Sequence, residues 1–228
     1  QALRGRRASW NLLDVSISAD EFMSRCRYQG ITALLYHCMK GRTEWPGWPQ
    51  QVRSALEQGS KAGIAEDLVR WHYLSILMEQ FAKRGIRSLL MKGEALAITH
   101  YLTPGTRERC DVDLFIHMND IDAVKQAANQ AGFAIASTVY KTHQFILRPD
   151  SEAYSSAAFD VHWRILNSPR FARVLEFDEA YEDSVEVPRL SNARMLNSPD
   201  ALLIACMHRL GSDRHDKNRL ICLHDIHV

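Results

Sequence analysis

The alternation of apolar and polar residues separates a helical first third of the chain from a mixed remainder. Apolar residues at helical spacing predict one or two helices between residues 18 and 39 and a longer amphipathic helix over residues 64–81. Segment 44–49, which lies between them, contains prolines and a glycine that interrupt a helix. Gly85 is well placed to end the longer helix.

After Gly85, short apolar runs alternate with helical patterns. They predict strands at residues 86–91, 111–117, 133–139, 144–147 and 158–164, a helix at residues 94–101 and a second helix that lies before Gly132 and includes Ile121, Val124 and Ala128. Asn119 or Asp120 can cap the second of these helices, Gly132 can end it, and residues 198–200 begin another helix. The pattern predicts an α+β fold, a mixed sheet flanked by helices, with helical segments at both ends.

The predicted elements divide the chain into three regions. We expect a helical region over residues 1–84, a sheet-containing core over residues 85–190 and the start of a C-terminal helical subdomain over residues 191–228. The chain opens with Gln1, and residues 225–228 continue a helical pattern without a stop signal. We therefore expect both ends to be cuts in a longer protein.

The charge balance, the cysteines and the apolar runs of the sequence indicate which kinds of partner and site the protein is expected to have. Twenty-eight basic residues against 27 acidic ones give a formal charge of +1, which does not favour an extended nucleic-acid surface or an anionic membrane. Five cysteines occur without a CxxC pair, so reduced thiols in a cytoplasmic protein are expected and a zinc site is not. No apolar run is long enough to cross a bilayer, and no signal peptide is recognisable.

Two aspartates on one strand provide the first candidate chemistry. Asp111 and Asp113 point to the same face with Phe115 and lie about 6–7 Å apart at the backbone, whereas Val112, Leu114 and Ile116 point to the other face. If residues 159–163 form a neighbouring strand, Asp160 and His162 emerge on the polar face as well. Three converging carboxylates need a cation, and oxygen ligands suit Mg²⁺, with Mn²⁺ as the alternative. The competing interpretation is the solvated face of a half-buried strand.

Basic residues stand close to these aspartates in the sequence. Lys92-Gly93-Glu94 lies where a strand passes into a helix, and a glycine there lets backbone N–H groups approach an anion, with Lys92 adding a charge for a triphosphate. Arg107 and Arg109 can pair with phosphate or form an ion pair with Asp111.

His162 shares a strand face with Asp160, so it can touch phosphate or orient that aspartate. A purely structural, hydrogen-bonded histidine explains its position equally well.

These residues form a recognisable set. They comprise Leu90-Met91-Lys92-Gly93, Tyr101, Arg107, Asp111-Val112-Asp113-Leu114 and Asp160-Val161-His162-Trp163. The set resembles the uncharacterised nucleotidyltransferase family of the polymerase-beta-like superfamily over about residues 86–164, with weaker similarity as far as Asp225. Superfamily members carry Gly-Gly or Gly-Ser at the turn, and Lys92-Gly93-Glu94 departs from this pattern because it has no serine.

The resemblance implies a Mg-dependent transfer of a nucleoside monophosphate from a nucleoside triphosphate, ATP among them, with release of pyrophosphate. The acceptor is a hydroxyl on a small molecule, a protein or an RNA end. Asp111 and Asp113 would hold the ion that grips the triphosphate, all three aspartates would share a second ion, and Asp160 would accept the hydroxyl proton. The implied nucleotide-binding residues are Lys92, Gly93, Arg107, Arg109 and His162.

Two other interpretations remain open. A catalytically idle module with this fold, such as a toxin–antitoxin component, would keep the aspartates and act through partners. Alternatively, His208 with His215-Asp216 and His224-Asp225 can surround two metals in a phosphohydrolase, although no further histidine-rich helix precedes them. The resemblance instead implies a C-terminal helical subdomain over the nucleotide, in which His208 and Asp225 form buried polar pairs.

Overall fold

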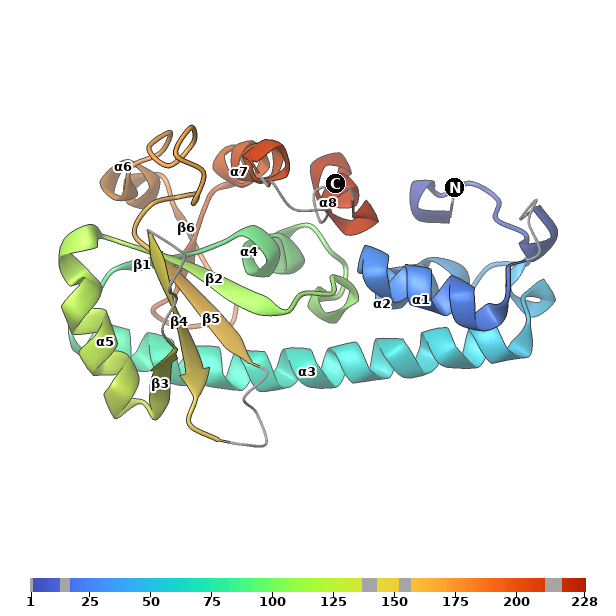
Figure 1. The fold of residues 1–228 in the computed structure, drawn as a ribbon, viewed down its shortest axis with the longest axis horizontal. Helices are drawn as coiled ribbons and strands as arrows, with labels where there is room; N and C mark the ends of the chain where they lie inside the picture. Colours follow the sequence, from blue (N-terminus) through green and yellow to red (C-terminus); the bar gives the residue numbers. More distant parts are fainter. Residues whose placement is uncertain (1, 13–16, 137–142, 152–156, 212–218) are drawn as a thin grey trace.

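A mixed sheet forms the centre of the protein (Figure 1). The structure is a computed structural model that describes residues 2–12, 17–136, 143–151, 157–211 and 219–228. Within these residues the sheet has seven strands in the order β3-β4-β5-β2-β1-β7-β6. Their bounds are β1 Ser88–Met91, β2 Asp111–Ile116, β3 Phe133–Ala136, β4 Gln144–Pro149, β5 Ala158–His162, β6 Val185–Glu186 and β7 Arg194–Met195.

The two strands that carry the aspartates are central neighbours. β2 pairs in parallel with β5 and antiparallel with β1, and β5 continues the sheet antiparallel to β4. The register places Asp113 opposite Asp160. The sheet topology therefore brings together two carboxylates that are far apart in the sequence.

Helices cover both faces of the sheet (Figure 1). α3 and α5 lie on one face, α6 and α7 lie on the other, and α4 directly follows β1 and contacts both β2 and α7. α1 and α2 pack against α3, and α8 contacts α7. The bounds are α1 Ala19–Gln29, α2 Thr32–Met39, α3 Gln50–Lys83, α4 Lys92–Thr99, α5 Ile121–Gln130, α6 Phe177–Glu182, α7 Ser198–Gly211 and α8 Leu220–His227.

Strand alternation assigns each face of β2 to a different core. Val112 and Leu114 pack into the cluster formed with α3 and α5, whereas Phe115 packs into the cluster formed with α6 and α7. Asp111 and Asp113 therefore project toward the α7 side. Both the predicted faces and the predicted α+β class are confirmed, with a mixed sheet flanked by helices.

The long helix α3 links two apolar clusters. Its last turns pack on the sheet through Leu74, Leu77 and Phe81, while its first turns pack against α1 and α2 through Val52 and Leu56. Such a helix spans about 50 Å, and Figure 1 shows it running along the length of the molecule. The prediction of helix 64–81 captured only its second half.

The termini of the first helix follow ordinary capping chemistry. Ser18 accepts the backbone N–H of Glu21 at 3.1 Å and begins α1, and Gly30, with φ of 66°, ends it in the left-handed conformation. Among the described helices, none is both long enough and apolar enough to pass through a membrane.

Some predicted elements differ from the observed ones. Asp120, one of the two predicted caps, makes no side-chain cap to α5, and the fold also includes the short 3-10 helix η4 (Pro104–Thr106). Residues 137–139 of the predicted third strand lie outside the described residues. The strands β6 and β7 and the helix α6 were not predicted, because two-residue strands and a six-residue helix are too short to show periodicity.

Candidate active site

Two buried carboxylates form the centre of the candidate site. Asp113 and Asp160 are cross-strand partners. The two residues are buried, with 6% and 8% of their surface exposed. One oxygen of each lies within 4.8 Å of the other and of a ring nitrogen of His162. Like charges at this separation repel in a dry environment, so the arrangement needs positive charge.

Lys92 supplies positive charge at this position. Its Nζ donates to Asp113 Oδ1 at 2.6 Å and lies 3.4 Å from His162 Nε2. The residue joins β1 to α4 with φ of 51°, a left-handed conformation that is unusual for a side chain other than glycine or asparagine. The sequence prediction of a strand-to-helix turn here is confirmed, and the turn directs the ammonium group onto the carboxylate.

The electrostatic environment keeps Asp113 ionised. Burial alone would raise the pKa of this carboxyl, but Lys92 and the hydrogen bond from His162 outweigh it and hold the pKa below its usual range. Asp113 is therefore a fixed negative charge at neutral pH.

His162 acts as a hydrogen-bond donor to Asp113 in this arrangement. Its Nε2 lies 3.0 Å from Asp113 Oδ1, and burial followed by the charge of Lys92 lowers its pKa, so the ring is neutral. Nδ1 is buried and has no hydrogen-bond partner among the described residues. A metal-ligating histidine normally donates its second N–H to a partner. We therefore favour the interpretation that His162 orients Asp113 over the one in which it binds an ion.

Gln144 supports the second carboxylate. Its Nε2 donates to Asp160 Oδ2 at 2.7 Å, and its own Oε1 accepts a hydrogen bond from Asn167. Both residues were missed at the sequence level. Gln144 stands on β4, and only the pairing of β4 with β5 reveals its contact with Asp160.

Asp111 lies beside the pair and responds to it electrostatically. Burial, reinforced by the negative charges of Asp113 and Asp160, raises its pKa from 3.8 to about 7. Asp111 lies outside the group whose ligand atoms all approach within 4.8 Å. Its predicted part in metal binding therefore stays a prediction, although its raised pKa indicates a position that favours added positive charge.

The raised pKa of Asp111 predicts a pH-dependent stability. Between pH 4 and 7 the folded chain keeps a proton that the unfolded chain has lost, so the wild-type protein loses stability as the pH rises through this window. Asp111→Asn removes the effect and is expected to stabilise the protein more at pH 8 than at pH 5. We expect a difference of at least about 1 kcal/mol, or about 2–4 °C in melting temperature. Equal stabilisation at both pH values in metal-free thermal unfolding would contradict this assignment.

The side chain of Arg107 lies against the turn after β1 and forms an ion pair with the C-terminal helix α8. Its Nε and Nη2 donate to the two carboxylate oxygens of Asp225 at 2.9 and 2.6 Å, and Tyr101 donates to the same carboxylate at 2.7 Å. A Cβ at Gly93 would lie 2.5 Å from Arg107 Nη1, so only glycine allows this approach. The group that approaches Gly93 closely is thus the guanidinium of Arg107, where the sequence predicted a phosphate. Nucleotide binding by Gly93 and Arg107 stays a prediction.

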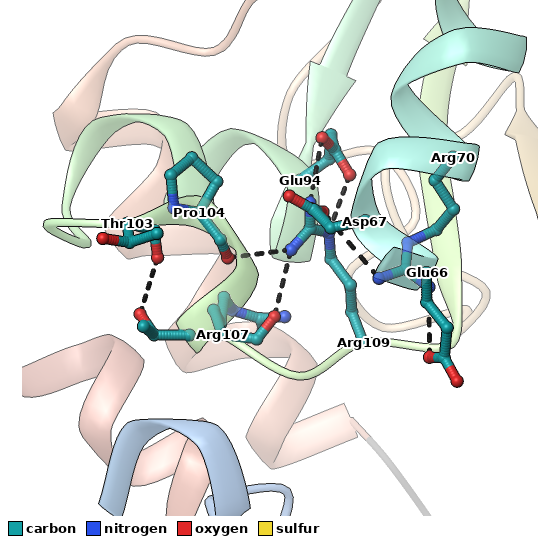
Figure 2. A network of polar contacts seen from close by, with 9 residues as sticks. Glu66, Asp67, Arg70, Glu94, Thr103, Pro104, Arg107 and Arg109 are labelled. Atoms are coloured by element: carbon teal, nitrogen blue, oxygen red, sulfur yellow. Dashed lines mark hydrogen bonds and ion pairs between the residues drawn. The ribbon is translucent and has the colours of Figure 1, made fainter. Parts of the chain in front are cut away.

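Arg109 occupies a buried ion-pair network rather than an open phosphate site (Figure 2). Its guanidinium donates to Glu94 at 2.7 Å, to Asp67 of α3 and to two backbone carbonyls. Arg109 and Glu94 side chains are each 2% exposed. The prediction that Arg109 binds nucleotide finds no support in this geometry. Glu94, in turn, points away from the turn, which removes a repulsion against phosphate.

The alternative histidine-based metal centre is not assembled by the described residues. Asp225 is engaged by Tyr101 and Arg107, while His215 and Asp216 lie outside the described residues. The expectation that His208 is buried is wrong, since its side chain is exposed on α7.

Comparison with known protein families shows the family to which this chain belongs. Residues 16–228 match the family described as "Uncharacterised nucleotidyltransferase". The chain belongs to this family. The match extends the resemblance beyond residues 86–164 to include the N-terminal helices, and it supports an enzyme whose class of activity is nucleotidyl transfer.

Two further comparisons complete the description. No curated protein matches the chain. A solved structure titled as the antibiotic-resistance factor ANT(2'')-Ia aligns at 12% identity over 70% of this chain and 83% of that one, with a TM-score of 0.48.

Proposed function

We propose that this chain transfers a nucleoside monophosphate from a nucleoside triphosphate to a hydroxyl group in a reaction that depends on Mg²⁺ or Mn²⁺. The observation that carries the proposal is the cross-strand pair of Asp113 and Asp160 with Lys92 at the start of α4. Two buried carboxylates provide the oxygen ligands that these ions prefer, and the ammonium group of Lys92 beside Asp113 supports a site that attracts positive charge. Asp111 completes the proposed ligand set.

A divalent ion bound at these carboxylates would neutralise phosphate oxygens and lower the pKa of the acceptor hydroxyl. Lys92 then pairs with the triphosphate, close to the N-terminus of α4, where backbone N–H groups also favour an anion. His162 holds Asp113 in place, and Gln144 does the same for Asp160. The roles of His162 and Gln144 follow from contacts that these side chains already make.

The proposed reaction is an in-line displacement. The hydroxyl oxygen bonds to the α-phosphorus, its proton passes to Asp160, and the bond from the α-phosphorus to the bridging oxygen breaks to release pyrophosphate. No covalent intermediate with the protein is required. The acceptor is an unassigned hydroxyl on a small molecule, a protein or an RNA end.

Ligand-dependent thermal stability tests nucleotide binding without knowledge of the acceptor. Mg²⁺ and a triphosphate at about 100 times the dissociation constant should raise the free energy of unfolding by about 2.7 kcal/mol. The measurement compares each of the common triphosphates with and without Mg²⁺, and an EDTA sample serves as the control. If no triphosphate raises the melting temperature, the catalytically idle module becomes the better interpretation.

Transfer itself is tested with triphosphates labelled at the α-phosphate. The protein is incubated with Mg²⁺ and a cell extract, and the fraction that takes up label identifies the class of acceptor. Uptake of label from the α-phosphate but not from the γ-phosphate is the expected result. The reverse pattern would indicate a phosphotransferase and would overturn the proposal.

A further inference from the structure

A pocket lined by several charged side chains lies against the segment that precedes β2. It has a volume of about 280 Å³ and is enclosed by α1, α3, the segment before β2 and the residue that precedes α8. A larger pocket of about 660 Å³ lies at the β6–β7 edge, and its described lining includes none of the three aspartates. The smaller pocket is distinguished by its charge, since five arginines contribute to its wall: Arg27, Arg70, Arg107, Arg109 and Arg219.

Arg70 is a buried cation without a hydrogen bond among the described residues. Its side chain is 8% exposed, and its Nε is buried without a partner. The carboxylates nearest to it, Glu66 and Asp67, are both 3.8 Å away, which is beyond hydrogen-bonding distance. A buried guanidinium normally satisfies its donors with a carboxylate or phosphate, so this one lacks an acceptor.

Arg219 repeats this pattern from another part of the chain. Its Nε is also buried without a partner among the described residues. The guanidinium lies over Gly30, where an added Cβ would come within 2.6 Å of its Nη2. The N–H of Leu220 is bonded to Gln29, so the backbone beside Arg219 is fixed against the end of α1. Two arginines from elements distant in sequence therefore line one pocket, and the Nε of each has no hydrogen bond among the described residues.

The other charged side chains that line the pocket do not accept a hydrogen bond from Arg70 Nε or Arg219 Nε. Arg107 and Arg109 are already paired with carboxylates, and the Glu66 side chain is 67% exposed to solvent. Glu108 accepts the backbone N–H of Ala33 at 2.7 Å, and burial raises its pKa, a shift that the charge of Arg219 opposes. Burial and the nearby charge of Arg109 lower the pKa of Arg70, and the carboxylates of Asp67, Glu94 and Glu66 only partly oppose that shift.

We propose that this pocket is a second ligand site, distinct from the triphosphate site, that binds the phosphate group of a small molecule through Arg70 and Arg219. A phosphate carries up to two negative charges and three terminal oxygens, so one group can accept from two guanidinium forks at once. A carboxylate has one charge and two oxygens and would leave one arginine unsatisfied. The volume is near the lower limit for small-molecule sites, which fits a phosphate with a small attached group.

Phosphate binding in the absence of metal and nucleotide tests the proposal. Isothermal titration in EDTA uses inorganic phosphate and glycerol phosphate as separate probes, which distinguishes free phosphate from a phosphomonoester as the ligand. Arg219→Gln and Arg70→Gln are each expected to weaken binding by about tenfold or more, because each removes a charged hydrogen-bond donor. Arg219 is only partly buried, so its variant decides the question if Arg70→Gln does not fold.

Two control variants separate this pocket from other cationic sites. Arg25→Gln removes an exposed arginine of α1 outside the pocket, and Lys92→Gln removes the cation of the candidate active site. Both are expected to bind the probes within about twofold of wild type. Loss of binding in Lys92→Gln but not in Arg219→Gln would overturn the proposal, as would the absence of binding by either probe or equal binding of acetate. None of these results depends on nucleotidyl transfer, which is measured separately.

Discussion

Replacing Asp113 with asparagine is expected to reduce nucleotidyl transfer by about 10²–10³-fold while the fold is retained. Asparagine has nearly the same shape as aspartate but lacks the charge that the site uses. Asp113 already accepts from Lys92 at 2.6 Å and from His162 at 3.0 Å, and these contacts hold its pKa below its usual range. Without the carboxylate, no fixed negative charge remains at this position to bind a divalent ion.

Two measurements make this prediction independent of the acceptor. The first is transfer of α-labelled nucleotide, and the second is Mn²⁺ affinity by titration calorimetry, which should fall with the loss of a ligand. Asp160→Asn should behave like Asp113→Asn in both. Asp122→Asn is the matched control, because Asp122 is an exposed carboxylate on α5. Wild-type activity and Mn²⁺ affinity in Asp113→Asn would place the active centre elsewhere.

The strand faces of the candidate site could be predicted because they depend on local chemistry. Alternation with a period of two is a property of a single strand, so Asp111 and Asp113 on one face and Val112 on the other follow from the sequence alone. The turn at Lys92-Gly93 follows similarly from the change between a strand pattern and a helical pattern.

The partners of the charged residues could not be predicted, because they come from distant elements. Asp160 meets Asp113 through the parallel pairing of β5 with β2, and Gln144 meets Asp160 through the next strand. A short sequence window contains no information on which strands become neighbours. The sequence indicated three carboxylates on suitable faces, and the sheet order was needed to bring two of them together.

The partners of the two arginines before β2 could not be predicted from the sequence either. Sequence proximity to Asp111 suggested that Arg107 and Arg109 pair with phosphate or with the aspartate. The structure pairs them with Asp225 of α8 and with Glu94 of α4 and Asp67 of α3. The geometry thus indicates that Arg109 connects three elements beneath the site, a role that can be separated experimentally from nucleotide binding.

Arg109→Met is accordingly expected to destabilise the protein by about 3–5 kcal/mol, because removal of one partner leaves buried charge uncompensated. The corresponding loss in melting temperature is about 10 °C for a chain of this size. Methionine keeps much of the volume of the side chain, so the effect reports charge rather than a cavity. Glu94, 2% exposed, and Asp67, 16% exposed, would then face each other without a cation.

The pH dependence identifies the cause of this loss. Burial already raises the pKa of Asp67, and Arg109 opposes that shift in the wild-type protein. In the variant the folded-state pKa rises further, so the folded chain retains a proton that the unfolded chain releases, and stability falls as the pH rises. The destabilisation should therefore be larger at pH 8 than at pH 5.

A double variant provides the matched control for this assignment. Arg109→Met with Glu94→Gln removes the buried charge together with its partner, so it should recover part of the lost stability. A nucleotide-binding role predicts a different outcome, in which Arg109→Met melts like the wild type and its triphosphate-dependent stabilisation is lost. Because the guanidinium is buried and donates to Glu94, Asp67 and two carbonyls, we expect the stability of the fold to respond first.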